Sequence, residues 1–296
     1  MSRSELRGVI SALHTPFTSS YDIDEEGFKA NIHYLIGEGV HGLMVAGTCG
    51  EFYALSLAER KRLVEVAVDE ANGEVPIIPH TGHSSTEIVI ELTRHAKDVG
   101  ADAALIVSPP FLRPTQQELC SHFESVAEAV DTPIIVYNNP SRAGVNIEPQ
   151  TIIELAGREN IVALKDSGRN LRQTMEVILG AGDKLTVLSG ETDLFLPTLA
   201  LGGKGGILAT SLVAPDLCLK IYDAYIKGKL DRAQEAHYRL LPLLGALGKE
   251  GKLHAALKAA VEMLGRPAGP MRRPKEALSE EGKSHLREAL KSLDLL

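Results

Sequence analysis

The sequence predicts an α/β fold, a (β/α)8 TIM barrel with a C-terminal helical extension. Eight short apolar runs of strand length alternate with amphipathic stretches of helical period, and after Pro215 the pattern becomes helical only. Two of the runs, at 134–136 and 161–164, are apolar on both faces, as parallel strands covered by helices are. Eight consecutive βα units favour a closed barrel over an open, doubly wound sheet.

The predicted strands and helices alternate regularly along the chain. The strands are residues 9–17, 42–47, 76–82, 103–110, 133–139, 161–166, 185–190 and 206–211. Each helical stretch begins at or beside Ser, Thr or Asn, the residues that helix N-caps prefer. The clearest helical stretches are residues 56–71, 85–99, 116–130 and 171–179.

The C-terminal part of the chain is predicted to be helical at 217–245, 253–264 and 281–295. We therefore expect a catalytic barrel domain over 1–214, completed by the first helix after Pro215, and a helical region over 215–296. The length of 296 residues allows this division, because α/β barrels of about 250 residues fold as one domain. Residues 265–274, with three prolines and three arginines, form the one linker-like segment.

Composition and charge argue against several classes of protein. Charged residues make up 24% and apolar residues 44%, close to the globular average, so disorder and coiled coil are not expected. The net charge of -8 and an aromatic content of 4% leave little basic or stacking surface for nucleic acid. No apolar run approaches the ~20 residues of a membrane helix, and residues 1–8 do not resemble a signal peptide. We expect a cytoplasmic protein with no membrane partner.

Motifs for metals, disulfides and phosphate-bearing cofactors are not found. Cys49, Cys120 and Cys218 are odd in number and far apart, which supports neither a disulfide framework nor a zinc site. His80, His83 and Asp102 lack the spacing of metal ligands. Residues 202–206 match neither the dinucleotide nor the P-loop pattern and are expected to form a turn. We expect no metal and no cofactor.

Lys165 is the clearest candidate for chemistry, because it follows four apolar residues near the end of a strand, where barrel active sites gather. Its amine either faces the barrel mouth or pairs with an acid such as Asp166, and its position alone leaves both interpretations open. Tyr137 holds the same fifth position in the preceding strand, so the two side chains can meet across one barrel layer. A shielded amine can form a Schiff base with a carbonyl, and a nearby phenol can carry protons.

Two loops offer polar groups for an anionic ligand. Residues 47–51, Gly-Thr-Cys-Gly-Glu, form a tight loop whose amides and hydroxyl can hold a carboxylate. Arg142 lies just beyond Tyr137 and suits bidentate binding of a carboxylate, with a surface ion pair as the alternative.

Together these segments resemble the family of dihydrodipicolinate synthases and N-acetylneuraminate lyases, which are Schiff-base-forming pyruvate aldolases. The resemblance runs from about Gly8 through the barrel and weakly into the helical tail. The loop at 47–51 is similar to the family's Gly-[Ser/Thr]-Thr-Gly-Glu, and Tyr-Asn-Asn-Pro at 137–140 is similar to its Tyr-Asn-x-Pro. Val-Ala-Leu-Lys-Asp at 162–166 resembles its Schiff-base lysine strand.

The resemblance implies a role for each matching residue. Lys165 would attack the keto carbon of pyruvate, Tyr137 would relay protons, and Thr48 would join that relay. The backbone amides of Thr48 and Cys49 would bind the pyruvate carboxylate, and Ile207 would supply a backbone carbonyl. The resemblance also implies a homotetramer built as a dimer of dimers, with pyruvate and an aldehyde or 2-keto acid as its small-molecule partners.

The branch of the family is set by the second substrate. Arg142 matches the synthases, which use this arginine on the aldehyde's carboxylate, so 4-hydroxy-tetrahydrodipicolinate (dihydrodipicolinate) synthase is the expected activity. Phe111 stands where the synthases have the relay tyrosine that they lend to a neighbouring subunit. A 2-keto-3-deoxy sugar-acid aldolase or dehydratase, or an N-acetylneuraminate lyase-like enzyme, is therefore the alternative, and a non-enzymatic small-acid sensor is a third possibility from another class.

The resemblance also bears on regulation. The effector site of lysine-sensitive synthases uses a histidine with small residues, then an Asn and a Glu, then a tyrosine. The corresponding positions here are Arg60 with the pair Phe52 and Tyr53, then Ser84 and Ile88, then Pro110. Inhibition by lysine is therefore not expected.

Overall fold

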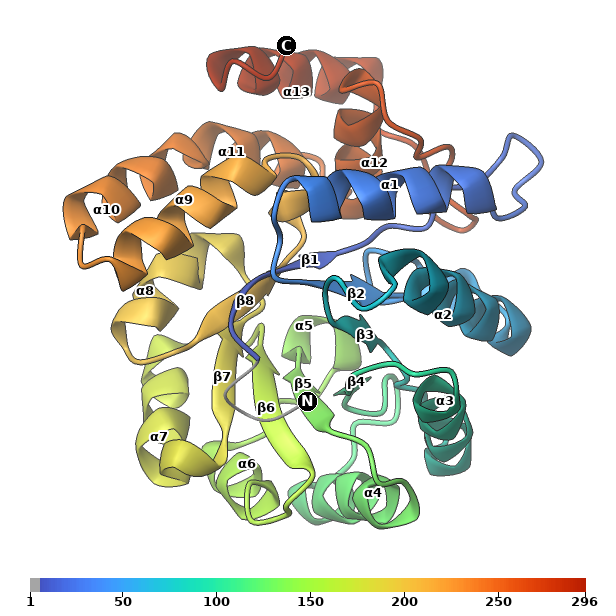
Figure 1. The fold of residues 1–296 in the computed structure, drawn as a ribbon, viewed down its shortest axis with the longest axis vertical. Helices are drawn as coiled ribbons and strands as arrows, with labels where there is room; N and C mark the ends of the chain where they lie inside the picture. Colours follow the sequence, from blue (N-terminus) through green and yellow to red (C-terminus); the bar gives the residue numbers. More distant parts are fainter. Residues whose placement is uncertain (1–5) are drawn as a thin grey trace. The chain divides into compact units, whose positions relative to one another are not determined.

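Eight β-strands occur in the described part of the chain, residues 6–296 of this computed structural model, and each overlaps one of the eight apolar runs (Figure 1). Their bounds are β1 Gly8–Ala12, β2 Gly42–Val45, β3 Ile77–Pro79, β4 Ala104–Val107, β5 Ile134–Asn138, β6 Ile161–Asp166, β7 Thr186–Ser189 and β8 Gly205–Leu208. Helices alternate with them throughout. The predicted fold class, a (β/α)8 barrel with a C-terminal helical extension, is confirmed.

The chain divides into two compact units, each formed from two separate stretches. The first unit contains Pro76–Ile207 with residues 6–8, and the second contains Val9–Val75 and Leu208–Leu296. The predicted domain boundary between 214 and 215 stays a prediction.

In the first unit, neighbouring strands from β4 to β8 pair in parallel and in chain order. Its helices are α3 Thr86–Asp98, α4 Gln116–Ala129, α5 Pro140–Ala143, α6 Pro149–Leu155, α7 Leu171–Ala181 and α8 Phe195–Ala200, with short 3-10 turns η2 Gly182–Lys184 and η3 Thr192–Leu194. Figure 1 shows α3, α4, α6 and α7 outside the strands. The core between these layers contains Phe123, Ile134 and Leu164, all fully buried. This packing gives β5 and β6 a rigid support.

Helix capping agrees with the sequence signals. Thr115 closes a capping box with Glu118 at the start of α4, and Asn170 accepts a hydrogen bond from the Gln173 amide at the start of α7. Ser85 precedes α3 without a side-chain cap. These caps satisfy amide groups that the first turn of a helix leaves open, which is why the helices begin where predicted.

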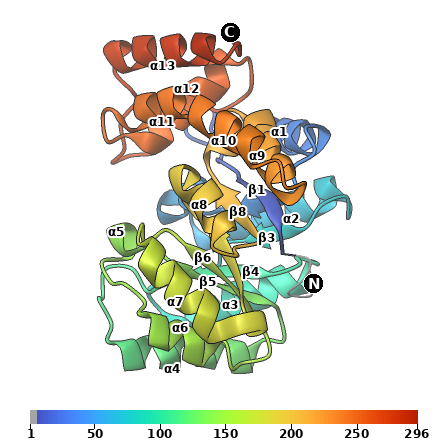
Figure 2. The ribbon, with the colours of Figure 1, turned by 90° about the vertical axis from the view of Figure 1, so that its left-hand side faces the viewer.

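In the second unit, β1 pairs in parallel with β2. The helices are α1 Glu25–Gly37, α2 Leu57–Ala71, α9 Pro215–Ile226, α10 Leu230–Arg239, α11 Leu241–Gly248, α12 Leu253–Met263 and α13 Glu280–Ser292, with 3-10 turns η1 Phe52–Ala54 and η4 Thr210–Leu212. Helices α11, α12 and α13 pack against one another (Figure 2). No helix within residues 6–296 is long and apolar enough to cross a membrane.

The stretch predicted as one helix over 217–245 is three helices, which corrects that expectation. Gly228 takes a left-handed φ of +70° and ends the first of them. Pro242 lies in the first turn of α11, where its missing amide proton is tolerated.

The segment predicted as a linker, residues 265–274, is held firmly within the second unit. His14 Nε2 lies 2.9 Å from the Pro267 carbonyl oxygen, and the Asn31 amide donates to the same oxygen at 2.7 Å. Gly269 adopts a φ of +67° and lies so close to the Phe17 backbone that a Cβ would clash with it. The prolines and glycines therefore serve close backbone packing rather than flexibility.

Candidate active site

Lys165 and Tyr137 lie side by side at the C-terminal ends of two neighbouring strands. They are paired positions in the parallel ladder between β5 and β6, and Lys165 Nζ lies 4.1 Å from the centre of the Tyr137 ring. Each residue is only 4% exposed. The prediction that Lys165 and Tyr137, each the fifth residue of its predicted strand, can meet across one barrel layer is therefore confirmed.

Asp166 does not compensate the lysine. Its side chain emerges on the other face of β6, where it accepts hydrogen bonds from the Gly168 amide at 2.8 Å and the Thr174 hydroxyl at 2.7 Å. Within residues 6–296, Lys165 Nζ makes no ion pair and no hydrogen bond. Of the two interpretations of Lys165 left open by the sequence, the structure supports an amine without an acidic partner.

The methylene chain of Lys165 is packed against the end of β7. The Gly190 amide donates to the Asp166 carbonyl at 2.7 Å, which brings the two backbones together. A Cβ added at Gly190 would lie 3.2 Å from Lys165 Cε. The missing side chain at 190 thus leaves room for the lysine.

A short polar chain leads away from Tyr137. The Asn139 side-chain amide donates to the Tyr137 phenol oxygen at 2.7 Å, and the Ser141 hydroxyl donates to Asn139 Oδ1 at 2.9 Å. Because the phenol oxygen accepts a hydrogen bond from the Asn139 amide, its own O–H can point in another direction. The arrangement fixes a phenol beside an amine, which suits proton transfer to groups bound there.

Arg142 lies on α5, the helix that follows β5 directly. Pro140 at the first position and left-handed Gly144 after the end explain why this four-residue helix forms. Arg142 is exposed and makes no ion pair within residues 6–296, so the surface ion pair considered as its alternative is not formed. Ile207 lies in β8 and is fully buried.

Thr48 and Cys49 lie in the loop after β2, in the second unit. Ala46 and Glu51 on either side of this loop have left-handed backbones, with φ of +51° and +58°. Non-glycine residues take this conformation only where surrounding contacts hold them, and such strain concentrates at functional sites. Cys49 is buried, while the half-buried Thr48 makes no side-chain hydrogen bond within the described part of its unit.

Two residues beside Lys165 and Tyr137 were not singled out from the sequence. Asn139 was considered only as part of a motif, and Gly190 only as the end of a strand. Within residues 6–296, no cluster of His, Cys, Asp or Glu could hold a metal ion.

Comparison with known proteins identifies relatives over the full chain. The family model for the dihydrodipicolinate synthetase family matches residues 5–293. A 4-hydroxy-tetrahydrodipicolinate synthase of Methanopyrus kandleri is 45% identical, over 99% of this chain and 98% of its own. The crystal structure of dihydrodipicolinate synthase from Aquifex aeolicus has a TM-score of 0.95 at 39% identity, over 98% of this chain and 99% of its own.

A third relative has been solved with a ligand. It is a prophage protein of the dihydrodipicolinic acid synthase family from E. coli K12, in complex with pyruvate. It is 31% identical, with a TM-score of 0.94 over 98% of this chain and 99% of its own. Because the family model and these relatives extend over nearly the whole sequence, this chain belongs to the dihydrodipicolinate synthetase family.

Proposed function

We propose that this protein is a Schiff-base-forming lyase that condenses pyruvate with an aldehyde, most like 4-hydroxy-tetrahydrodipicolinate synthase. Full-length relatives at 45% and 43% identity carry that name. The observation that carries the chemistry is Lys165, a buried amine that lies against Tyr137 and has no acidic partner within residues 6–296.

The first half of the reaction takes place at Lys165. Its amine attacks the keto carbon of pyruvate, a C–N bond forms, and the keto oxygen leaves as water to give an imine. Tyr137, oriented by Asn139, delivers and removes the protons of these steps, and Thr48 shares in the relay. The protonated imine acidifies the neighbouring methyl group, which loses a proton to give an enamine, and the enamine carbon then attacks the carbonyl carbon of the aldehyde.

Two further groups bind the substrates. The backbone amides of Thr48 and Cys49 hold the pyruvate carboxylate, and the Ile207 carbonyl faces the pyruvate. Arg142 holds a carboxylate on the aldehyde, for which its guanidinium, exposed and without an ion pair to any residue of 6–296, is suited. This arginine favours the synthase over a sugar-acid aldolase or dehydratase, which remains the second candidate because Phe111 replaces a relay tyrosine.

We propose a homotetramer, a dimer of dimers, in the cytoplasm. Support comes from the loop after β4, where Phe111 is 91% exposed with a left-handed φ of +75°, and the adjoining Leu112 is 57% exposed. An aromatic side chain held in this way gains by burial against another subunit.

Borohydride reduction in the presence of pyruvate tests the proposal. The wild-type protein gains the mass of one reduced pyruvate, located at Lys165 by peptide mapping, and Lys165→Ala gains none. A kinetic screen of pyruvate with aspartate semialdehyde and with sugar aldehydes identifies the second substrate. A wild-type protein that forms no adduct would refute the lyase, and preference for a sugar aldehyde would replace the synthase by the second candidate.

A further inference from the structure

The second unit contains a buried ion pair that the proposed chemistry does not use. Glu51, the last residue of the loop at 47–51, is 0% exposed, and Lys258 on α12 is 3% exposed. Glu51 Oε1 lies 2.7 Å from Lys258 Nζ. The pair connects positions 207 residues apart, so it joins the loop after β2 to the C-terminal helices.

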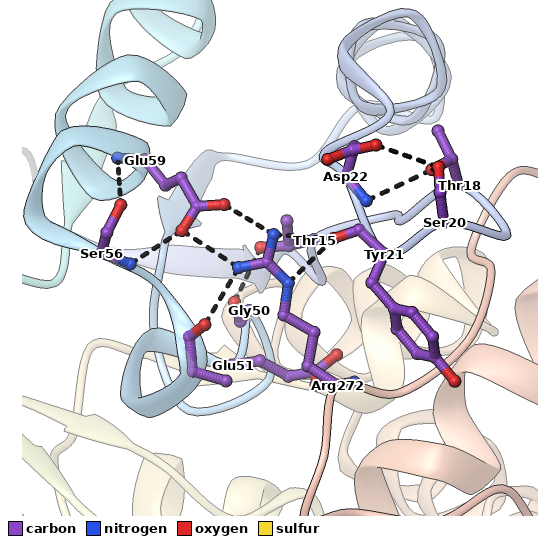
Figure 3. Close-up of polar contacts among 11 residues, drawn as sticks. Thr15, Thr18, Ser20, Tyr21, Asp22, Gly50, Glu51, Ser56, Glu59 and Arg272 are labelled. Atoms are coloured by element: carbon purple, nitrogen blue, oxygen red, sulfur yellow. Dashed lines mark hydrogen bonds and ion pairs between the residues drawn. The ribbon is translucent and has the colours of Figure 1, made fainter.

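Each charge also has a partner outside the pair. The Arg272 backbone amide donates to Glu51 Oε2 at 3.0 Å, and Figure 3 shows this carboxylate beside Arg272. Lys258 Nζ also donates to the Pro270 carbonyl at 2.8 Å and lies 4.2 Å from the centre of the Phe17 ring. Burial lowers the pKa of Lys258, and Glu51 opposes that shift. Removing either partner leaves the other charge buried and uncompensated.

Arg272 extends this anchor past Glu51. Its guanidinium donates to the Ala54 carbonyl at 3.0 Å and to Glu59 Oε2 at 3.0 Å, and Glu59 forms the capping box of α2 with Ser56 (Figure 3). The stretch from Glu51 to the first turn of α2 is therefore held by one C-terminal segment.

The backbone of Glu51 and Phe52 closes the turn that contains Thr48 and Cys49. The Glu51 amide donates to the Thr48 carbonyl at 3.2 Å, and the Phe52 amide donates to the Gly47 carbonyl at 3.2 Å. Each accepting carbonyl belongs to a peptide plane whose N–H is that of the following residue. These N–H groups are the Cys49 and Thr48 amides.

In a trans peptide the C=O and the N–H point in opposite directions across one rigid plane. A hydrogen bond that fixes the carbonyl on one side therefore aims the N–H on the other. The two hydrogen bonds from Glu51 and Phe52 aim the Cys49 and Thr48 amides, the pair assigned to the pyruvate carboxylate.

We propose that Glu51 and Lys258 are positioning residues for pyruvate binding: the C-terminal helical region holds the turn so that the Thr48 and Cys49 amides converge on a carboxylate. The inference rests on the proposed function. It predicts that breaking the pair weakens recognition of the carboxylate specifically, whereas a purely structural pair would lower only the melting temperature.

The test uses Glu51→Gln and Lys258→Met, with Leu257→Ala as matched control. Leu257 is a buried neighbour on α12, so its truncation destabilises the same helix and leaves the pair intact. For each folded variant, borohydride trapping is titrated with pyruvate and, separately, with acetone, a ketone without a carboxylate. KM for the aldehyde and the melting temperature are measured alongside.

Both pair variants are expected to raise the pyruvate concentration for half-maximal trapping by about tenfold, the effect of a weakened charge-assisted contact. Trapping of acetone and KM for the aldehyde should change by less than about twofold. Leu257→Ala should lower the melting temperature without moving the pyruvate titration. Should Lys258→Met fail to fold, the nearly isosteric Glu51→Gln carries the test.

Wild-type pyruvate titration in either pair variant would overturn the inference and leave the proposed function intact. An equal loss with pyruvate and acetone, or an equal loss in Leu257→Ala, would also overturn it, because the effect would then be general destabilisation. A wild-type protein without any pyruvate adduct would overturn both.

Discussion

Gly190→Ala should slow imine formation, because the glycine leaves room for the chain of Lys165. An added Cβ would lie 3.2 Å from Lys165 Cε and 3.1 Å from the Asp166 carbonyl oxygen, and it would overlap Ser167 Oγ. The hydroxyl can rotate away, but the lysine is buried and must shift by a few tenths of an ångström. Tight contacts of this kind are relieved by movement of the more flexible atom.

The expected magnitude follows from that shift. A displacement of about 1 Å in a reacting group can lower a rate by ~10²-fold, so a few tenths of an ångström correspond to about three- to tenfold. This is roughly 0.7–1.4 kcal/mol in the activation free energy. The fold should persist, because the clash involves side-chain atoms that can move and only a 3.1 Å approach to backbone.

Single-turnover trapping with saturating pyruvate measures the rate of imine formation directly. Repeating Gly190→Ala in a Ser167→Ala background removes the overlapping hydroxyl, so the remaining effect reports on Lys165. Gly245→Ala, in open space on α11, is the control and should leave the rate unchanged. A wild-type rate in Gly190→Ala would show that packing does not position the lysine, and a slowing that disappears without the Ser167 hydroxyl would assign it to that residue.

Four further outcomes are expected. Arg142→Ala should raise KM for the aldehyde by about tenfold or more and change KM for pyruvate by less than about twofold, and Arg142→Lys should not restore full activity in steady-state kinetics. Asn139→Ala should lower kcat about tenfold, with no further loss when combined with Tyr137→Phe if Asn139 acts through the phenol. Burial lowers the pKa of His14 from 6.5 to about 3, so the unfolded chain takes up a proton that the folded one excludes. Stability contributed by neutral His14 is complete above pH 6.5 and falls by about 1.4 kcal/mol per pH unit down to about pH 3, and urea unfolding of His14→Gln should show a flatter profile. Millimolar lysine should give no saturable heat in calorimetry, because Arg60, whose guanidinium carbon lies 5.5 Å from the centre of the Phe52 ring, adds a positive charge that opposes a cationic ligand.

The pairing of Lys165 with Tyr137 could be predicted because strands repeat every two residues and neighbouring barrel strands lie parallel. The prediction also benefited from an irregularity that no sequence pattern showed. Ile134 pairs with Ile161, but Ile135 pairs with Ala163, so β6 has one extra residue at Val162. This bulge restores the expected register at the C-terminal ends, where the chemistry lies.

Strand ends were predicted less well than strand positions. The run at 9–17 was predicted as one strand, whereas β1 ends at Ala12. Leu13 and Phe17 remain buried beyond it, so apolar character continued after the sheet had ended. A periodic pattern reports burial, and burial is shared by strands and by the packed loops that follow them.

Contacts between residues far apart in the sequence could not be predicted from any periodic pattern. In the sequence, Glu51 ends the motif at 47–51, and Lys258 is the one charged residue in an apolar run. Neither pattern indicates that the two side chains form an ion pair. Residues 265–274, which follow α12, pack closely against Phe17 and His14. The proline and arginine content of this segment had instead indicated a linker. Only tertiary structure joins such pairs.

Lys165 and Lys258 are both buried, but the groups around their nitrogen atoms differ. Lys258, 3% exposed, has Glu51, the Pro270 carbonyl and the Phe17 ring around its ammonium, so every direction of approach is occupied. Lys165 is 4% exposed and its Nζ lies 4.1 Å from the centre of the Tyr137 ring, and no carboxylate within residues 6–296 pairs with it. The proposed reaction needs an amine without such partners, and of these two lysines Lys165 is the one that meets this requirement within residues 6–296. The two side chains are buried to the same degree, so it is the partners of each nitrogen that distinguish the proposed nucleophile from the proposed anchor.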